Sequence, residues 1–229
     1  MKAGIMQPYF FPYIGYFQLI NAVDKFIILD EVNYIKKGWI NRNYIEIAGA
    51  SFLFTLPISK ASQNTLISDC TIDSSSSWKH RFLKTLSLGY AKAPYFKPVF
   101  PIIEAILLHQ EVNLVRFLEH SLKQLCDFLQ IRTVIIPGTA CYNNLHLRGQ
   151  DRIVDICQQE GAEVYINPAG GVDLYNKNLF KLKHIELQFL RTHPVPADGV
   201  AKPPFSIIHL MMHHSREKIT LMLGQFDLQ

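Results

Sequence analysis

The sequence lacks the patterns that mark several common classes of enzyme. Its 229 residues contain no G-x-S-x-G, no Walker loop and no G-x-G-x-x-G, so the usual signatures of serine hydrolases, P-loop nucleotide hydrolases and Rossmann dinucleotide enzymes are missing. The zinc motif H-E-x-x-H and the pair C-x-x-C are absent as well, and the sequence therefore predicts no metal site.

Charge is scarce, and neither sign is concentrated in one segment. Charged residues make up 18% of the sequence, the formal net charge is +4, and Lys36-Lys37 is the longest run of basic residues. This is too little for a nucleic-acid partner, although it suits an anionic small molecule. No long apolar window without a charge occurs, so we expect no membrane span.

The cysteines are few and widely spaced, at positions 70, 126, 141 and 157. Without a pairing pattern they are expected to stay reduced, which fits the cytoplasm. The N-terminal stretch is interrupted by prolines and has neither the apolar region nor the cleavage site of a signal peptide. We therefore expect a cytoplasmic protein.

What the sequence does contain is an alternation of strand and helix patterns. Hydrophobic residues make up 48% of the chain, which is typical of a folded globular protein. Apolar runs at 3–7 and 25–30 surround a helical pattern at 12–22, and this order predicts a β-α-β unit with a parallel sheet. The alternation returns later, with strands expected at 132–137, 163–168 and 184–190 and a helix at 147–162.

The middle of the chain is less regular. Its patterns predict a hairpin of strands at 39–47 and 51–59, a helix at 76–90, a helix beginning after Pro101, an amphipathic helix at 112–129 and a helical tail at 205–223. We predict one α/β domain over residues 1–229, with a parallel sheet flanked by helices and an irregular central insertion near residues 35–100.

The first candidate site is the aromatic stretch after the first predicted strand. In open parallel sheets, ligands bind beyond the carboxyl ends of the strands, where the first N–H groups of the next helix attract anions. Gln7, Tyr13, Gly15 and Tyr16 would line this pocket, and Gly15 would permit close approach of a ligand. The alternative interpretation is a core helix packed through its aromatic rings.

The second candidate site combines Asp30 and Glu31, at the end of the second predicted strand, with the polar and aromatic residues that follow. These are Tyr34, Lys36, Lys37, Trp39, Asn41, Arg42 and Asn43. An arginine binds carboxylate or phosphate through two N–H groups, amides bind sugar hydroxyls, and the neighbouring Trp39 can stack on a sugar or a base. The alternative is a capped loop with a surface ion pair.

The third candidate site is the loop after the strand at 163–168, with Asn167, Gly170 and Gly171. A Gly-Gly pair at such a place can form an anion-binding nest of backbone N–H groups. It can equally form an ordinary turn.

The histidines suggest one further catalytic candidate. His80 lies beside Arg81 in a predicted helix and could act as a general base, although a solvated helix residue is the competing interpretation. His209 and His213 have the spacing of a helical metal pair but no third ligand close in sequence, so packing is the simpler role.

Residues 5–45, IMQPYFFPYIGYFQLINAVDKFIILDEVNYIKKGWINRNYI, resemble the opening of the WbqC-like family. The resemblance continues in APYF, RIVDICQQEGAEVYINPAGGVDLY, ELQFL and FSIIHLM and so covers almost the whole chain. Members of this family occur in bacterial O-antigen and surface-polysaccharide gene clusters. The resemblance therefore implies that the protein modifies a sugar or an amino sugar.

A more distant likeness links the same stretch to the nucleotidylyl-transferase superfamily and implies a Rossmann-like fold of the HUP type. In those enzymes two histidines after the first strand bind nucleotide phosphates and stabilise the charge that develops during transfer. Tyr13 and Tyr16 occupy those positions here, and a tyrosine hydroxyl donates a hydrogen bond without carrying positive charge. This departure is compatible with a related pocket but puts nucleotidyl transfer in doubt.

These observations predict a transferase that moves an acyl or aminoacyl unit onto a sugar or a nucleotide-linked sugar in surface-polysaccharide biosynthesis. His80 and Asp30 are the predicted catalytic residues, and no cofactor is identified. The predicted substrate-binding residues are Gln7, Tyr13, Gly15, Tyr16, Lys37, Asn41, Arg42, Asn167, Gly170 and Gly171. The alternatives are a non-catalytic nucleotide- or sugar-binding module and an adenylate-forming ligase, and the aromatic surface could also serve a homodimer.

Overall fold

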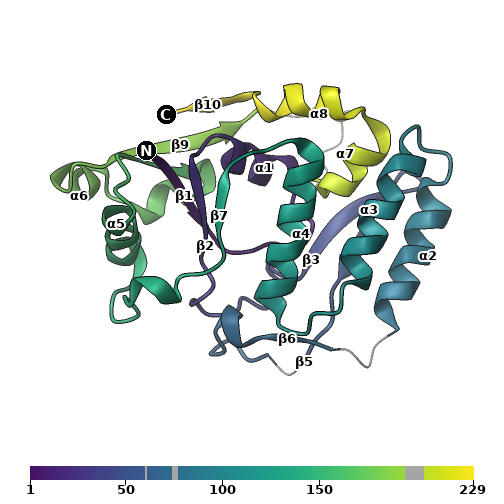
Figure 1. Ribbon diagram of the computed structural model, residues 1–229, viewed down its shortest axis with the longest axis horizontal. Helices are drawn as coiled ribbons and strands as arrows, with labels where there is room; N and C mark the ends of the chain where they lie inside the picture. The colour runs from purple at the N-terminus through teal and green to yellow at the C-terminus, as the bar shows by residue number, and fades with distance from the viewer. Residues whose placement is uncertain (60, 74–76, 194–203) are drawn as a thin grey trace.

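A computed structural model describes residues 1–59, 61–73, 77–193 and 204–229. Its centre is a six-stranded sheet in the order β10-β9-β8-β1-β2-β7 (Figure 1). The strands are β1 (Lys2–Met6), β2 (Lys25–Ile28), β7 (Val134–Ile136), β8 (Val164–Pro168), β9 (Glu186–Thr192) and β10 (Phe226–Leu228). All neighbours pair in parallel except β10, which is antiparallel to β9. The predicted Rossmann-like α/β fold is confirmed.

The order of the strands contains one change of direction. From β1 the chain moves outward through β2 to β7, then crosses to the other side of β1 and continues through β8 to β9. The loops that follow β1 and β8 therefore lead to elements on opposite sides of the sheet. In doubly wound folds, a crevice that binds ligands forms at this switch point, outside the carboxyl ends of the two strands.

Helices cover both faces of the sheet. The larger core joins the sheet to α1 (Ile14–Asn21), α4 (Leu114–Leu129), α7 (Ile207–His213) and α8 (Arg216–Leu223), and the smaller core joins it to α5 (Gly149–Gln159) and α6 (Lys177–Leu182). The side chains of a strand alternate between faces, so Phe26 and Ile28 enter the larger core while Ile27 enters the smaller one. Among the described residues, no helix is long and apolar enough to cross a bilayer.

The chain between β2 and α4 forms the part of the molecule on the right of Figure 1 and below its sheet. It contains β3 (Arg42–Ile47), β4 (Ala50–Thr55), β5 (Ile58–Ser59), β6 (Thr71–Ile72), α2 (Trp78–Tyr90) and α3 (Phe96–Leu108). The predicted hairpin is confirmed: β3 and β4 are antiparallel, and the turn residues Ala48 and Gly49 both have positive φ, at 51° and 79°. Phe54 of the hairpin stacks on Phe82 of α2 with ring centroids 4.6 Å apart, so these elements share the larger core.

Several element predictions are wrong in detail. Helix α3 begins at Phe96 and contains Pro101, although an interior proline removes one helical hydrogen bond and its ring crowds the carbonyl four residues before it. The C-terminal tail forms two helices, because Ser215 accepts a hydrogen bond from the backbone N–H of Lys218 and starts α8. Strand β9 is not the last strand, since β10 pairs with its outer edge.

Candidate functional site

The candidate site lies at the switch point, where Gln7 follows β1 and Asn167 lies near the end of β8. Gln7, Tyr9 and Tyr13 are half-buried in the β1–α1 connection. Their side-chain polar atoms have no hydrogen-bond partner among the residues that the structure describes. Half-buried polar groups without an internal partner are available to a ligand.

The two half-buried tyrosines keep their protons near neutral pH. Burial raises the pKa of Tyr9 to about 12, and the neighbouring Tyr13 adds to this increase. Burial also raises the pKa of Tyr13. Each phenol therefore offers an O–H donor and an acceptor oxygen on an aromatic ring, a combination that suits the hydroxyl groups and apolar faces of a sugar.

Tyr16 has a different role from Tyr13. It is 1% exposed, and its hydroxyl donates a hydrogen bond of 2.8 Å to the backbone carbonyl of Gln7. Burial raises the pKa of this phenol well above its usual value. Tyr16 thus holds the backbone at the end of β1 and uses its hydroxyl internally.

Gly15 makes room for Tyr13. A Cβ atom at this position would lie 2.5 Å from the ring of Tyr13 and 2.6 Å from the methyl group of Thr192. Both distances are far shorter than a carbon–carbon contact allows. The space that Gly15 leaves is therefore filled by Tyr13 and by the end of β9.

Phe11 has a strained backbone within the same connection. Its φ of 43° lies in the left-handed region, which bulky residues rarely adopt. Its carbonyl accepts one hydrogen bond from Asn43 Nδ2 at 2.9 Å and another from Ser206 Oγ at 2.7 Å. Asn43 lies on β3 and Ser206 is the N-cap of α7, so two distant segments hold this turn. The sequence had placed Asn43 in the predicted cluster around Asp30 and had not indicated Ser206 at all.

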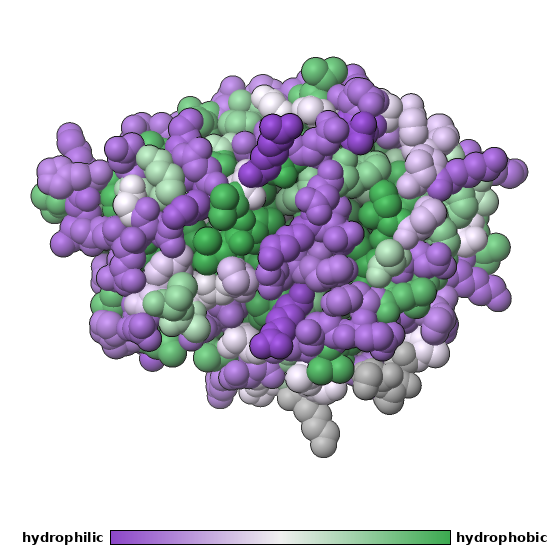
Figure 2. Space-filling view, viewed as in Figure 1, coloured by the Kyte–Doolittle hydropathy of each residue, from purple (hydrophilic) through white to green (hydrophobic). Residues whose placement is uncertain are grey.

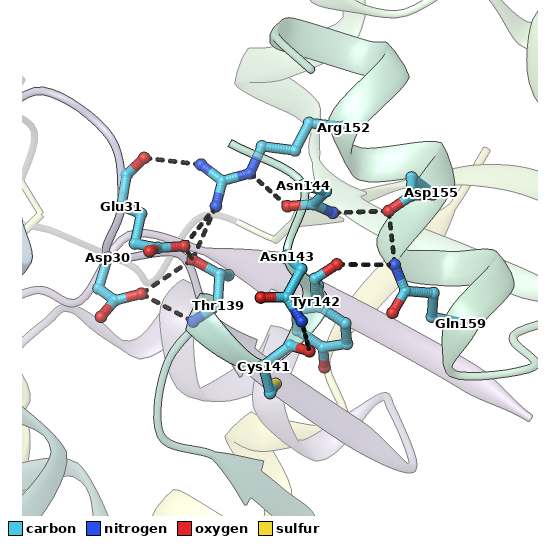
Figure 3. Close-up of polar contacts among 10 residues, drawn as sticks. All are labelled: Asp30, Glu31, Thr139, Cys141, Tyr142, Asn143, Asn144, Arg152, Asp155 and Gln159. Carbon is cyan, nitrogen blue, oxygen red and sulfur yellow. Dashed lines mark hydrogen bonds and ion pairs between the residues drawn. The ribbon is translucent and has the colours of Figure 1, made fainter. Parts of the chain in front are cut away.

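Asp30 is held at the ends of two neighbouring strands (Figure 3). It follows β2, while Thr139 follows β7. One carboxylate oxygen of Asp30 accepts a hydrogen bond from the backbone N–H of Thr139 at 2.8 Å and lies 3.0 Å from the Thr139 hydroxyl. The other oxygen lies against Gly138, where a Cβ atom would come within 2.8 Å. The carboxylate is therefore fixed in one orientation.

Arg152 of α5 extends this polar network. Its guanidinium donates to the backbone carbonyl of Glu31 at 2.6 Å and to the Glu31 carboxylate at 2.7 Å. A third bond runs from Nε to Asn144, which in turn donates to Asp155 (Figure 3). Arg152 is 5% exposed, and a buried guanidinium needs such partners to offset its lost hydration. The network joins α5 to the loops after β2 and β7.

The structure does not bring the second predicted cluster together around Asp30. Asn41 is buried, where it accepts from the Tyr34 hydroxyl at 2.8 Å and donates to the carbonyl of Leu56 at 2.8 Å. Arg42 donates to the backbone carbonyls of Lys37 and Gly38, so its guanidinium binds its own loop.

No hydrogen bond or ion pair links Lys37, Asn41 or Arg42 to Asp30 among the described residues. Lys37 is exposed, with a φ of 64°.

The loop after β8 is compact. Asn167 is buried, accepts from the Tyr165 hydroxyl at 3.0 Å and donates to the carbonyl of Pro168 at 2.9 Å. Gly170 and Gly171 belong to a 3-10 helix over Ala169–Leu174. Neither has the positive φ that alternates with αR in an anion-binding nest. Gly170 is exposed, and a Cβ at Gly171 would overlap the Asn167 amide.

His80 lies in a different part of the molecule. It is exposed on α2 and lines a hollow of about 170 Å³ with Asp73, Trp78 and Gln110. The residues of this hollow belong to the elements between β2 and α4, including β6 and the start of α2, whereas the switch point lies at the ends of β1 and β8.

The histidines with helical metal-pair spacing, His209 and His213, pack against the ring of Tyr90. Tyr90 and His209 Nδ1 lie 3.1 Å apart, and the ring of His209 is 4.7 Å from that of His213. Within the described ranges, no three His, Cys, Asp or Glu side chains are grouped to hold a metal ion. Burial raises the pKa of both Cys126 and Cys157 to about 12, so these thiols stay protonated and are poor nucleophiles.

Comparison with known proteins gives the family of the chain. The model of the WbqC-like protein family matches residues 7–221. The uncharacterized protein Rv1507c of Mycobacterium tuberculosis is 28% identical over 181 residues, which cover 78% of this chain and 77% of that protein. No solved structure shows a significant match. Because the family model spans nearly the whole chain, including the switch-point connection, the protein belongs to the WbqC-like family.

Proposed function

We propose that the protein is a cytoplasmic transferase of bacterial surface-polysaccharide biosynthesis, which adds an acyl or aminoacyl unit to a sugar or a nucleotide-linked sugar. The sugar binds at the switch point between β1 and β8. The observation that carries this proposal is the group of half-buried polar side chains, Gln7, Tyr9 and Tyr13, without partners among the described residues. Membership of the WbqC-like family supports the assignment to this class of pathway.

The chemistry of these side chains suits a hydroxyl-rich ligand. The phenols of Tyr9 and Tyr13 donate to sugar oxygens, the Gln7 amide both donates and accepts, and the aromatic rings contact the apolar face of the sugar.

In this proposal Asp30 is the general base. Thr139 holds one of its oxygens, and the other accepts a proton from the sugar hydroxyl or amine as that group attacks the acyl carbonyl. The attacking atom forms the new bond to carbon, and the acyl donor's leaving group departs with the bonding electrons. The proposal assigns no step to His80, because His80 lines a separate hollow.

The second candidate function is a module that binds a sugar or a nucleotide without converting it. The observation that favours it is the pair Tyr13 and Tyr16, which occupy the positions of the phosphate-binding histidines in nucleotidylyl transferases. The Tyr16 hydroxyl is already bonded to the backbone of Gln7. A site of this kind retains contacts for binding but has no cationic group to stabilise nucleotidyl transfer.

A thermal-shift and turnover experiment tests both candidates. Purified protein is screened against nucleotide sugars, free amino sugars and acyl thioesters, and each ligand that raises the melting temperature is incubated with the protein and a donor and analysed by mass spectrometry. A ligand at 100 times its dissociation constant stabilises the fold by about 2.7 kcal/mol. The transferase proposal expects a sugar product whose mass has increased by the acyl or aminoacyl group.

Matched tyrosine variants locate the site. Tyr13→Phe removes one O–H donor and should weaken ligand binding about 2–10-fold, as loss of one hydrogen bond of about 0.5–1.5 kcal/mol implies. Tyr95→Phe changes another half-buried tyrosine, at the start of α3, and should leave the affinity unchanged. Equal effects of both variants would reject the switch-point site, and a ligand that returns unconverted with every donor would support the binding module.

A further inference from the structure

The hairpin of β3 and β4 has one closed edge and one open edge. On the β3 side, the carbonyl of Tyr44 accepts a hydrogen bond of 2.7 Å from the N–H of Ser206, the residue that caps α7. On the β4 side, no other strand pairs with the hairpin among the residues that the structure describes. Every residue of β4 except Phe54 is exposed, so this edge is accessible to a partner.

The backbone groups along the open edge are arranged as an unpaired β-ladder. The N–H of Leu56 donates to the carbonyl of Asn41 at 2.7 Å, so Leu56 and every second residue before it point their backbone groups toward β3. The N–H and carbonyl groups of Ser51, Leu53 and Thr55 therefore point outward. Within the described ranges, these outward groups have no hydrogen-bond partner.

This edge lacks the features with which proteins protect an edge strand. Natural edge strands carry charged side chains, prolines or bulges that discourage pairing with another chain. Residues 50–56, ASFLFTL, contain no charge and no proline, and β4 pairs with β3 without a bulge. Phe52 and Leu53 lie on opposite faces of the strand, and each is 40% exposed. A neutral edge with exposed apolar side chains indicates a surface that another strand covers.

The sequence of β4 favours a second copy of the same strand. Antiparallel ladder bonds form only where outward residues face outward residues. A two-fold axis at Leu53 sets Leu53 opposite its own copy and Ser51 opposite Thr55, so all the outward donors and acceptors are used. A shift of two residues in one direction would set Ser51 opposite Pro57, which has no N–H. The same shift in the other direction would set Thr55 opposite Gly49 in the turn.

The register centred on Leu53 also pairs similar side chains. Leucine faces leucine at the axis, and the hydroxyl of Ser51 faces that of Thr55. On the other face of the strand, Phe52 lies opposite Phe54 of the second copy. Aromatic pairs and hydroxyl pairs of this kind stabilise neighbouring antiparallel strands. Because β4 has no charge, two copies of it meet without electrostatic repulsion.

We propose that β4 pairs with β4 of a second copy of this chain, antiparallel across a two-fold axis at Leu53. The resulting homodimer has a continuous four-stranded sheet in the order β3-β4-β4-β3. A two-fold interface uses the open hairpin edge of both copies, so the assembly is closed at the dimer. The inference is independent of the proposed transferase activity.

Sedimentation equilibrium of the full-length protein tests this interface. The proposal expects the wild type to change from monomer to dimer as its concentration rises to about 100 μM, where an interface with a micromolar dissociation constant is mostly occupied. Leu53→Lys and Leu53→Glu should each raise the dissociation constant about tenfold or more, because like charges directly opposite each other disfavour pairing. An equimolar mixture of the two variants should dimerise again, since opposite charges then meet at the axis.

Leu182→Lys is the matched control. Leu182 is 77% exposed on α6, which lies at the left end of Figure 1, where Figure 2 shows mostly hydrophilic residues. The same chemical change at this distant position should alter the dissociation constant less than about twofold.

Leu53→Pro tests the ladder itself. It removes an N–H that points away from β3, so the hairpin keeps its own bonds while the dimer loses the bonds at its axis. Circular dichroism shows which variants have folded. A wild type that stays monomeric at about 100 μM would overturn the proposal. A dimer that Leu53→Lys weakens no more than Leu182→Lys would also overturn it, as would a mixture of the two charged Leu53 variants that dimerises no better than either alone.

Discussion

The strained turn at Phe11 provides a quantitative test of how the switch-point connection is held. Its buried carbonyl accepts hydrogen bonds from Asn43 and Ser206, at 2.9 and 2.7 Å. Asn43→Ala removes one of these bonds and Ser206→Ala removes the other, while the double variant removes both. Because the two variants share one acceptor, their effects on the free energy of unfolding should not be additive.

The magnitudes follow from the partners of each side chain. Asn43→Ala also deletes a bond from the backbone N–H of Tyr44, and Ser206→Ala also deletes the N-cap that accepts from Ile208. Each single variant should therefore cost about 2 kcal/mol, at about 1 kcal/mol per hydrogen bond or cap. In the double variant the carbonyl of Phe11 has no partner, and a buried orphan carbonyl costs about 1–3 kcal/mol. We expect the double variant to lose about 1 kcal/mol more than the sum of the single variants.

Urea unfolding followed by circular dichroism measures these free energies. The matched control is a second double-mutant cycle, which combines Ser206→Ala with Asn41→Ala. Asn41 is another buried amide with two hydrogen bonds. Asn41 and Ser206 share no partner, so their effects should add within about 0.5 kcal/mol. If the Asn43–Ser206 cycle were as additive as this control, the two bonds would not jointly hold Phe11 and the reasoning would be refuted.

Three further predictions concern the residues around the site. Gly15→Ala should displace the ring of Tyr13 and lower the free energy of unfolding by about 1–3 kcal/mol; a melting temperature equal to that of the wild type would contradict this. Arg152→Met should cost about 3–5 kcal/mol in urea unfolding because it leaves the Glu31 carboxylate without its ion-pair partner, and the added change Glu31→Gln should restore part of the loss. Burial alone would raise the pKa of Glu160, but hydrogen bonds from a lysine and a tyrosine outweigh it and lower the pKa. The ionised carboxylate therefore stabilises the fold at neutral pH. The advantage of the wild type over Glu160→Gln, about 1 kcal/mol at pH 7, should be lost as the pH falls through the lowered folded pKa of Glu160, in unfolding measured over a series of acidic pH values.

The sheet strands were predictable because their signal is local. Residues 3–7, 25–30 and 163–168 are short apolar runs, as expected for strands with both faces covered, and they became β1, β2 and β8. The hairpin of β3 and β4 was predictable for a similar reason, since Gly49 lies between two runs rich in β-branched and aromatic residues.

Elements that depend on distant partners were not predictable. Strand β10 has three residues, and its place in the sheet comes from pairing with β9. Helix α6 has six residues and follows a loop that resembles a turn. Short elements of this kind have little intrinsic stability, so tertiary contacts decide whether they form.

In the candidate site too, local sequence predicted some features and tertiary contacts decided others. The expectation that polar residues gather where parallel strands end identified Gln7, Tyr13 and Asp30 at the carboxyl edge of the sheet. It could not separate Tyr13, which is half-buried, from Tyr16, whose hydroxyl binds the backbone. The two have the same chemistry, and only their positions on α1 distinguish them.

The sequence by itself determined the family, the parallel sheet and the edge of the sheet at which ligands are expected, because periodicity and motifs are properties of neighbouring residues. Only the tertiary structure decided which polar side chains remain available. Arg152 bonds to Glu31 across 121 residues, and Ser206 bonds to Phe11 across 195. A buried polar group must find a partner wherever the fold provides one, and that choice depends on distances that no local pattern contains.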